Sequence, residues 1–329
     1  MDLVSIVLAV RNEEKIISNC LKSLLKQRLN EGVELELLVI DGMSDDKTAE
    51  IVKLLEGEFP NKVRYILNTQ KITPVAFNLG IQNAKGNYIG IFGSHNAYAD
   101  DYIQTCLSEM KRVGADGCSG TVNSIFMQDN WETELCKSLL SSPIGVTSGS
   151  FRNKGEGFAD TIPYGIFKKS VFDKVGLYNE GLIRNQDNDM NHRIIKAGFK
   201  LYITSKTSTD YFPKQQLKPL LQYAFHSGFW HAKTLLLGSF SLKPMHFIPF
   251  FFVLYQLVSV AILCFAIFSK TWSLAIVSLF PILLYFFLVI YFNQKNTFKF
   301  KENYTRFLLA VYRFHTSYGW GTLMGFFKK

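Results

Sequence analysis

The chain has little cysteine and no cysteine pattern that would hold a metal or a disulfide framework. Its 329 residues include five cysteines, an odd number, and none falls in a CxxC or zinc-type spacing. Disulfide-rich and zinc-knuckle folds are therefore not supported, and a reducing compartment is expected. The opening MDLVSIVLAV also lacks a basic leader and a small-residue cleavage site. We interpret it as a strand and not as a signal peptide.

Charge is absent from two long stretches late in the chain. Neither Phe247–Phe268 nor Trp272–Phe292 contains a charged side chain, and each has about the twenty residues needed to cross a hydrocarbon core. Only the tripeptide SKT separates them. We predict two transmembrane helices over 245–292, joined as a tight hairpin. Two buried core helices are the alternative, but soluble helices seldom run so long without a charge on any face.

Acidic residues are scarce after the second stretch, where basic residues face only Glu302. The basic residues are Lys295, Lys299, Lys301, Arg306, Arg313, Lys328 and Lys329. The positive-inside rule then places the basic tail, 293–329, on the cytoplasmic side as a membrane-associated segment. Two spans return the chain to the side it came from, so the N-terminal domain is expected there too. We predict a multi-pass protein of the cell inner (plasma) membrane.

The net charge of +9 suits anionic lipid headgroups and diphosphate-bearing substrates. The first half of the chain has no basic run interleaved with aromatics. Nucleic acid is therefore not an expected partner.

The first two hundred residues alternate short β-branched runs with amphipathic stretches, as in LVSIVLA followed by IISNCLKSLLKQ and ELELLVI followed by DKTAEIVKLLEGEF. This alternation predicts an α/β domain over 1–215 with a mostly parallel, doubly wound sheet. An amphipathic helix lying at the membrane interface is expected over 216–244. Ligands of such sheets bind at the carboxyl ends of the strands.

Polar residues follow the first two predicted strands. Asp41 ends the second strand and opens DGMSDDKT. Its carboxylate can accept the imide N–H of a uracil-type base or a ribose hydroxyl, although a turn with a helix cap explains the stretch as well. Asn12 and Glu13 follow the first strand. The combination points to a nucleotide site more strongly than either part does.

Several segments taken together resemble a family 2 glycosyltransferase, an inverting enzyme with the GT-A fold that uses nucleotide sugars. The resemblance runs through VSIVLAVRNEEKIISNCLKSLL, LLVIDGMSDDKT, GIQNAKGNYIGIF, DTIPYGIFKKSVFDKVGLYNE and NQDNDMNHRIIKAGFK. It is nearest to membrane-attached transferases of succinoglycan and exopolysaccharide biosynthesis, which also carry C-terminal spans and a tail like HTSYGWGTLMG.

The resemblance implies roles for individual residues. Asp187 in NQDND takes the position of the family's catalytic base, preceded by Gln186 where the family more often has Glu. A general base of this kind contributes about 10²- to 10⁴-fold in rate. The nucleotide-sugar site is expected to include Ala9, Asn12, Glu13, Asp41 and Ser94. The acceptor side is expected to include Tyr164, Gly165 and Gln186, although a simple loop is the alternative for Tyr164 and Gly165.

A glycine stands where the family's metal motif begins. Aligning IFGSHNAYADDY with an Asp-x-His pair places Gly93 on the Asp and His95 on the His. Hard divalent ions prefer oxygen ligands and take several from the diphosphate, whereas imidazole suits manganese better than magnesium. Three interpretations follow: a Mn²⁺ or Mg²⁺ enzyme with His95 as its protein ligand, an enzyme that neutralises the diphosphate with cationic side chains, and a slow or inactive partner protein.

The expected activity is transfer of a sugar, with inversion, from a nucleotide diphosphate sugar to a hydroxyl of a lipid-linked glycan in bacterial exopolysaccharide or capsule biosynthesis. UDP is the expected nucleotide, with GDP left open, and other polysaccharide assembly enzymes are candidate partners. One alternative is a polyprenyl-phosphate sugar synthase. Another is a membrane-anchored protein that binds nucleotide sugar with little turnover.

Overall fold

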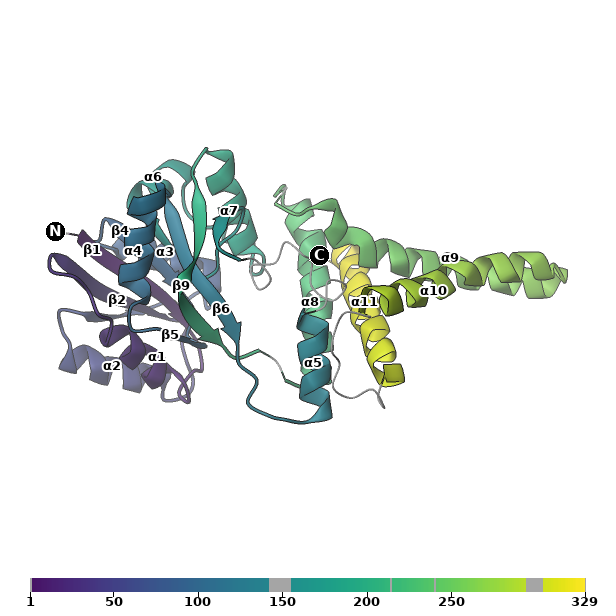
Figure 1. Ribbon diagram of the computed structural model, residues 1–329, viewed down its shortest axis with the longest axis horizontal. Coiled ribbons are helices and arrows are strands. Elements are labelled where there is room, and N and C mark those ends of the chain that lie inside the picture. The colour runs from purple at the N-terminus through teal and green to yellow at the C-terminus, as the bar shows by residue number, and fades with distance from the viewer. Residues whose placement is uncertain (1, 142–154, 214, 240, 294–303, 329) are drawn as a thin grey trace. The chain divides into compact units, whose positions relative to one another are not determined.

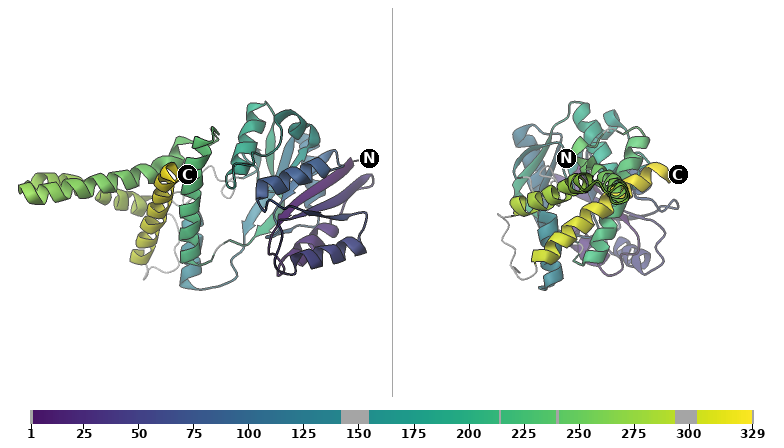
Figure 2. Two further views of the ribbon diagram at one scale, coloured as in Figure 1. Left: turned by 180° about the vertical axis from the view of Figure 1, so that it is seen from behind. Right: turned by 90° about the vertical axis from the view of Figure 1, so that its right-hand side faces the viewer.

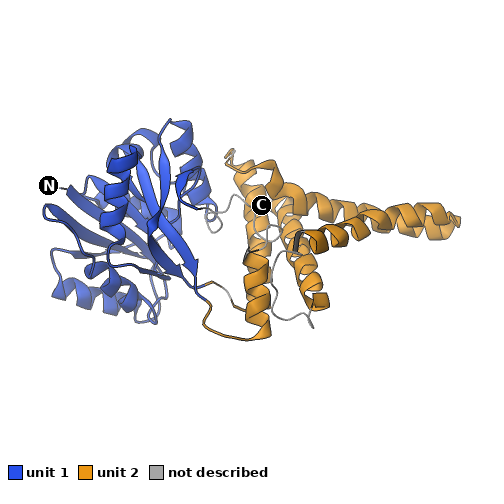
Figure 3. Cartoon of the chain, in the orientation of Figure 1, with its two compact units in different colours: residues 1–125, 151–212 blue, residues 126–150, 213–329 orange. Residues whose placement is uncertain are grey.

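A computed structural model describes residues 2–141, 155–213, 215–239, 241–293 and 304–328. The chain divides into two compact units, one formed by 1–125 with 151–212 and the other by 126–150 with 213–329 (Figure 3). The second unit therefore takes a segment from within the stretch that the sequence assigned to the N-terminal domain. Of the residues named for the predicted basic tail, Lys295, Lys299, Lys301, Glu302 and Lys329 lie outside the described residues.

The first unit is built on a nine-stranded sheet with the path β3-β2-β1-β4-β8-β6-β9-β5, and β7 pairs with β9 (Figure 1). Strands β1, β2, β3 and β4 are mutually parallel, whereas β8 runs antiparallel to both β4 and β6. The strands are β1 (Asp2–Val10), β2 (Val33–Asp41), β3 (Val63–Leu67), β4 (Tyr88–Phe92), β5 (Asn96–Tyr98), β6 (Gly117–Ser124), β7 (Gly157–Ala159), β8 (Ile166–Lys168) and β9 (Leu201–Tyr211).

Alternation along the strands divides the apolar core between the two faces of the sheet. Leu8 and Leu37 point into one cluster, which α1, α2 and α4 cover, while Val7 and Leu38 point into the other, beneath α3, α6 and α7. This is the period-two pattern of a sheet covered on both faces. The helices are α1 (Ile17–Leu25), α2 (Thr48–Glu58), α3 (Thr73–Asn83), α4 (Tyr102–Val113), α6 (Lys169–Val175) and α7 (Gln186–Lys196).

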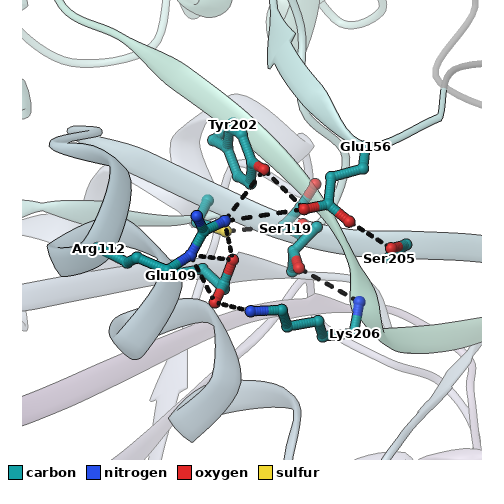
Figure 4. Close-up of polar contacts among 9 residues, drawn as sticks. Glu109, Arg112, Ser119, Glu156, Tyr202, Ser205 and Lys206 are labelled. Atoms are coloured by element: carbon teal, nitrogen blue, oxygen red, sulfur yellow. Dashed lines mark hydrogen bonds and ion pairs between the residues drawn. The ribbon is translucent and has the colours of Figure 1, made fainter.

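A β-bulge in β9, beside β6, positions a side chain in a network of charged residues (Figure 4). The register between β6 and β9 jumps, so that Thr204 pairs with Gly120 but Ser208 already pairs with Thr121. The intervening bulge directs Lys206 to the buried carboxylate of Glu109, with Nζ 2.7 Å from Oε1. Bulges commonly re-aim a side chain in this way.

The second unit is helical, with α5 (Trp131–Ser141), α8 (Leu217–Leu236), a short 3-10 turn η2 (Pro244–Phe247), α9 (Ile248–Ser269), α10 (Trp272–Asn293) and α11 (Tyr304–Phe327). Helices α8 and α11 pack closely because glycines line their contact: a Cβ on Gly228 would collide with the carbonyl of Tyr318, and one on Gly321 with that of Phe225. Small residues that let helix backbones touch are typical of membrane helix pairs.

Helices α9 and α10 coincide with the two predicted spans and lie side by side, projecting away from α8 and α11 (Figure 2). Only 17% of the most apolar stretch of the first and 11% of the second is buried. Large side chains such as Phe268 and Ile276 are exposed. An apolar surface of this extent indicates association with a membrane. The predicted fold, a mostly parallel α/β sheet followed by two C-terminal apolar helices, is confirmed.

Candidate active site

Three strand ends meet at one edge of the sheet in the first unit. Val10 is in register with Asp41 on one side of β1, and Leu8 is in register with Phe92 on the other. Because these strands are parallel, the segments that follow them emerge at the same edge. The residues predicted for the nucleotide-sugar site all lie on these strand ends or directly after them.

Asp41 is buried at the end of β2 and accepts hydrogen bonds from three donor groups of the protein. Its Oδ1 accepts hydrogen bonds from the hydroxyl and the backbone N–H of Ser44, at 2.6 and 3.1 Å. Its Oδ2 accepts one from the hydroxyl of Tyr65, at 2.8 Å. Burial, followed by this contact with Asp41, raises the pKa of Tyr65 to about 12, so that the phenol remains a donor. Asp41 thus shapes the loop that follows β2.

The loop after β1 is clamped to the loop after β2. Asn12, in the left-handed region at φ 57°, accepts a hydrogen bond on Oδ1 from the backbone N–H of Asp45 at 2.8 Å. Its own N–H donates to the Ser44 hydroxyl, and the Glu13 N–H donates to the Thr48 hydroxyl. Half-buried Ala9 precedes this turn within β1. These contacts hold the backbone of both loops in place. They do not use the carboxylate of Glu13, which contacts His95.

The space beside Gly93 is filled by its neighbours. A Cβ at this position would lie 2.9 Å from Oδ1 of Asn96 and 2.9 Å from Cε1 of Tyr164. The Gly93 N–H donates to the hydroxyl oxygen of Tyr98 at 2.9 Å, and that hydroxyl is 3.2 Å from the Gly93 carbonyl. A carboxylate at position 93 would therefore require both neighbouring side chains to move. Oδ1 of Asn96 is itself buried and has no hydrogen-bond partner among the described residues.

The carboxylate of Glu13 contacts His95, two residues after Gly93, which stands at the aspartate position of the family's metal motif. Its Oε1 is 2.8 Å from Nε2 of His95, whose side chain is 60% exposed, whereas that of Glu13 is 15% exposed. Ser94, between Gly93 and His95, is buried. Across the described parts of the chain, no group of three or more His, Cys, Asp or Glu is placed to hold a metal. One imidazole and one carboxylate fit an ion that takes most of its ligands from a bound diphosphate, and they do not form a complete cage.

The acceptor-side segment reaches the same edge through Tyr164. The Tyr164 ring is one of the two side chains that block a Cβ at Gly93, and the Tyr164 backbone carbonyl accepts a hydrogen bond from the Tyr102 hydroxyl at 3.0 Å. Gly165 is buried, and a Cβ there would lie 2.5 Å from Cδ1 of Ile162. Packing therefore explains the glycine, whereas Tyr164 is half-buried beside the strand end.

Asp187 lies in the first turn of α7, where the helix dipole favours a carboxylate. Its side chain reaches solvent, yet surrounding protein removes enough water to raise its pKa to about 6. Asn191, one turn further on, donates to the Asp187 carbonyl at 2.7 Å and accepts from the Ile162 N–H at 3.4 Å. These bonds tie the Asp187 turn to the segment that carries Tyr164. Oε1 of neighbouring Gln186 is buried without a partner among the described residues.

The sequence did not reveal several residues that hold the site together. Tyr98 and Tyr65 fix Gly93 and Asp41 through their hydroxyls. Tyr98 lies within the quoted IFGSHNAYADDY stretch but outside its Asp-x-His pair, and Tyr65 lies in no quoted motif. A tyrosine near a strand end has no signal that distinguishes a site residue from a core residue. The proximity of Glu13 to His95 was accessible in principle, because both follow the ends of adjacent parallel strands.

Comparison with known proteins gives the family of a chain with this fold and this cluster of polar residues at the sheet edge. The model of glycosyl transferase family 2 matches residues 5–176, so the chain belongs to that family. It is a glycosyltransferase, related to transferases of polysaccharide and glycan biosynthesis. The family implies a nucleotide-sugar donor and a glycan acceptor, and it commonly uses a divalent metal.

Two curated relatives and one solved structure illustrate the similarity. The dolichyl N-acetyl-alpha-D-glucosaminyl phosphate 3-beta-D-2,3-diacetamido-2,3-dideoxy-beta-D-glucuronosyltransferase of Methanococcus voltae is 28% identical, with 80% of this chain and 84% of that protein covered. The succinoglycan biosynthesis protein ExoA of Rhizobium meliloti is 28% identical, with 61% of each chain covered. TarS of S. aureus gives a TM-score of 0.47 at 15% identity, with 71% of this chain and 43% of TarS covered.

Proposed function

We propose that this glycosyltransferase moves a sugar, with inversion, from a nucleotide diphosphate sugar, UDP-linked in the first instance, to a hydroxyl of a lipid-linked glycan. The observation that carries the proposal is the meeting of Asp41, Glu13 and Gly93 at one sheet edge, with Tyr164 reaching that edge and hydrogen bonds connecting its segment to Asp187. Of the two relatives described above, one is by its name a glucuronosyltransferase of a dolichyl N-acetyl-alpha-D-glucosaminyl phosphate, and the other is a succinoglycan biosynthesis protein.

Asp187 is proposed as the base. Its carboxylate accepts the proton of the acceptor hydroxyl while that oxygen forms a bond to the anomeric carbon, and the bond from this carbon to the diphosphate oxygen breaks on the opposite face. A pKa of about 6 suits the task, because the group is ionised at neutral pH and still basic enough to accept a proton. The carbonyl oxygen of Gln186 is buried and has no hydrogen-bond partner in the part of the chain that the structure describes, so it is suited to accept a hydrogen bond from an acceptor hydroxyl.

The donor side is proposed to use Ala9, Asn12, Asp41 and Ser94. Asp41 already has three hydrogen bonds, so its contribution to nucleoside recognition is the shape of the loop together with its remaining lone pairs. Asn12 acts through the backbone that it fixes. We therefore expect Asp41→Asn to weaken nucleotide binding partly by releasing Tyr65 and Ser44.

We propose that His95, with Glu13 beside it, holds the divalent ion, with a preference for manganese. When bound, the ion supplies charge neutralisation to the leaving diphosphate. Titration of Mn²⁺ into the protein with UDP, followed by electron paramagnetic resonance, tests this assignment without turnover. Tighter Mn²⁺ binding in the parent than in His95→Ala and Glu13→Gln is expected. Equal Mn²⁺ binding in all three proteins would contradict this assignment and favour neutralisation of the diphosphate by cationic side chains.

The activity test is release of UDP from a panel of UDP-sugars by detergent-solubilised protein with a lipid-linked acceptor extract, in manganese, magnesium or EDTA. Manganese-dependent release that Asp187→Asn and His95→Ala both abolish is the expected result. Release that survives EDTA and His95→Ala but not Asp187→Asn would indicate that cationic side chains, and not a metal ion, neutralise the diphosphate. UDP binding without release for any donor would contradict the proposed transfer.

The location is proposed from the same features. Helices α9 and α10 are long and apolar enough to cross a membrane and are largely unburied. We infer that they form a hairpin in the inner (plasma) membrane and that the first unit faces the cytoplasm, where nucleotide sugars are made. Cysteine substitutions at Ser269 and Thr271 should be labelled only by reagents that reach the outer face. Labelling by impermeant reagents added from the cytoplasmic side would overturn this topology.

A further inference from the structure

The helical second unit contains a groove of about 530 Å³ between α5, α8 and α11. Glu132 comes from α5, whereas Leu217, Lys218, Leu221, Gln222 and Phe225 form one face of α8 and Arg313 and Ser317 one face of α11. Residues three, four and seven apart share a helix face. The groove is therefore built by whole faces of two helices and closed by a third, and its size is typical of ligand sites.

The lining combines apolar surface with positive charge. Arg313 and Lys218 are exposed, and among the described residues neither has an ion-pair or hydrogen-bond partner. Glu132 is already engaged, because its Oε1 accepts the backbone N–H of Leu217 at 2.8 Å. Two unpaired cations over a floor that includes Leu221 and Phe225 favour a ligand that is anionic at one end and apolar at the other.

The two apolar helices α9 and α10 contact α11, which forms one wall of the groove. Val289, near the end of α10, is buried in the same cluster as Leu220 of α8 and Phe314 of α11. At the start of α9, Gly319 approaches the carbonyl of Pro249 so closely that a side chain would not fit. The start of the first apolar helix and the end of the second thus both contact α8 or α11. In a membrane hairpin these two ends lie at the same interface, at the depth of lipid phosphates.

We propose that this groove binds the phosphate of the lipid that carries the acceptor glycan, with Arg313 and Lys218 contacting the phosphate oxygens and Leu217, Leu221 and Phe225 contacting the first part of the lipid chain. The choice of the acceptor's lipid, rather than a bulk phospholipid, rests on the proposed function. Its consequence is that the transferase holds its acceptor by the anchor, separately from the sugar hydroxyl that reacts.

Binding of radiolabelled undecaprenyl phosphate to the full-length protein in phosphatidylcholine nanodiscs tests the proposal without requiring turnover. Arg313→Ala and Lys218→Ala should each weaken binding roughly tenfold, as expected for loss of a charge-assisted hydrogen bond. Arg313→Lys should retain most of the affinity. The control Lys62→Ala, which removes an exposed cation before β3 in the first unit, should leave it unchanged.

Further measurements separate the explanations. UDP binding and the thermal midpoint should be the same in all variants, because the substituted side chains are exposed. Inorganic phosphate should compete only weakly, since it lacks the apolar part. Equal affinity of parent and variants, or equal competition by phosphatidylglycerol, would overturn the assignment. If the parent transfers no sugar yet binds the lipid through Arg313 and Lys218, the proposed function fails and the lipid site stands.

Discussion

At the scale of single residues, the neighbours of Gly93 leave no room for a side chain at the position where the family's metal motif begins. The volume that a side chain would need is taken by Asn96 and Tyr164. The carboxylate nearest to His95 comes from a different strand end, as Glu13. The glycine is therefore consistent with the packing around it.

Gly93→Asp is expected not to restore a metal site and to destabilise the first unit. Overpacking a filled position costs about 1–3 kcal/mol, because Asn96 and Tyr164 must move. The measurement is the free energy of unfolding together with Mn²⁺ affinity. Gly155→Asp is the matched control, since nothing lies within 4 Å of a Cβ there. Unchanged stability and tighter manganese binding in Gly93→Asp would contradict this prediction.

Asp187 should set the acidic limb of the pH profile. Desolvation by the surrounding protein raises the pKa of Asp187 to about 6, so the fraction of ionised base, and with it kcat/KM, should fall tenfold per pH unit below that value. Asp187→Asn should reduce kcat by about 10²-fold or more. A raised carboxyl pKa means that the folded state binds the proton more tightly than the unfolded state, so stability is lost as pH rises from the ordinary value of 3.8 to about 6, and the ionised carboxylate opposes folding at pH 7. The variant should therefore be no less stable at pH 7, and a clear loss of stability would indicate a structural role.

At the scale of elements, the contact between α8 and α11 depends on residues without side chains. Gly321→Leu places a side chain against the carbonyl of Phe225 and should destabilise the helical unit by about 1–3 kcal/mol. Met324→Leu, on the exposed face of the same helix, should have little effect. Thermal unfolding in detergent distinguishes them, and equal midpoints would show that the helices do not touch at Gly321.

The charged network on α4 and the β9 bulge should stabilise the first unit only above acidic pH (Figure 4). Hydrogen bonds from Arg112 and then Lys206 lower the pKa of Glu109 to about 2. A lowered pKa means that the contribution is complete above the ordinary glutamate value near 4.5 and is lost as pH falls from there toward 2. Urea unfolding should show the parent more stable than Glu109→Gln at pH 7, with the two converging near pH 2. A constant difference across this range would exclude ionisation as the cause.

At the scale of the whole molecule, the sequence predicted most of the fold but not how its segments divide. Strand periodicity, the strand-end position of Asp41 and the uncharged runs all depend on local chemistry, so they could be predicted from neighbouring residues. The tyrosines that hold Gly93 and Asp41, and the assignment of α5 to the helical unit, depend on contacts between distant parts of the chain. No local pattern specifies such contacts.

A chain that ends at residue 212 should be poorly soluble, even though it retains every strand. Leu135, Cys136 and Leu139 of α5 are buried against α8 and α11, which such a chain lacks. Exposed apolar helices promote aggregation. Replacing Leu135 and Leu139 with Gln in the shortened chain should recover monomer, as measured by size-exclusion chromatography. A monomeric unsubstituted chain would show that α5 does not need these partners.

The helical unit is formed by two separate segments of the chain, so its helices are synthesised at different times. The ribosome completes α5 well before α8, and before α11 by more than half the length of the chain. Until those helices emerge, the apolar face of α5 is uncovered. The two chain segments that form the sheet flank α5 in the sequence, and both are complete before α8 begins. We expect the nascent chain to need membrane insertion or a chaperone at this stage, so that maturation of the transferase is coupled to delivery to the bilayer.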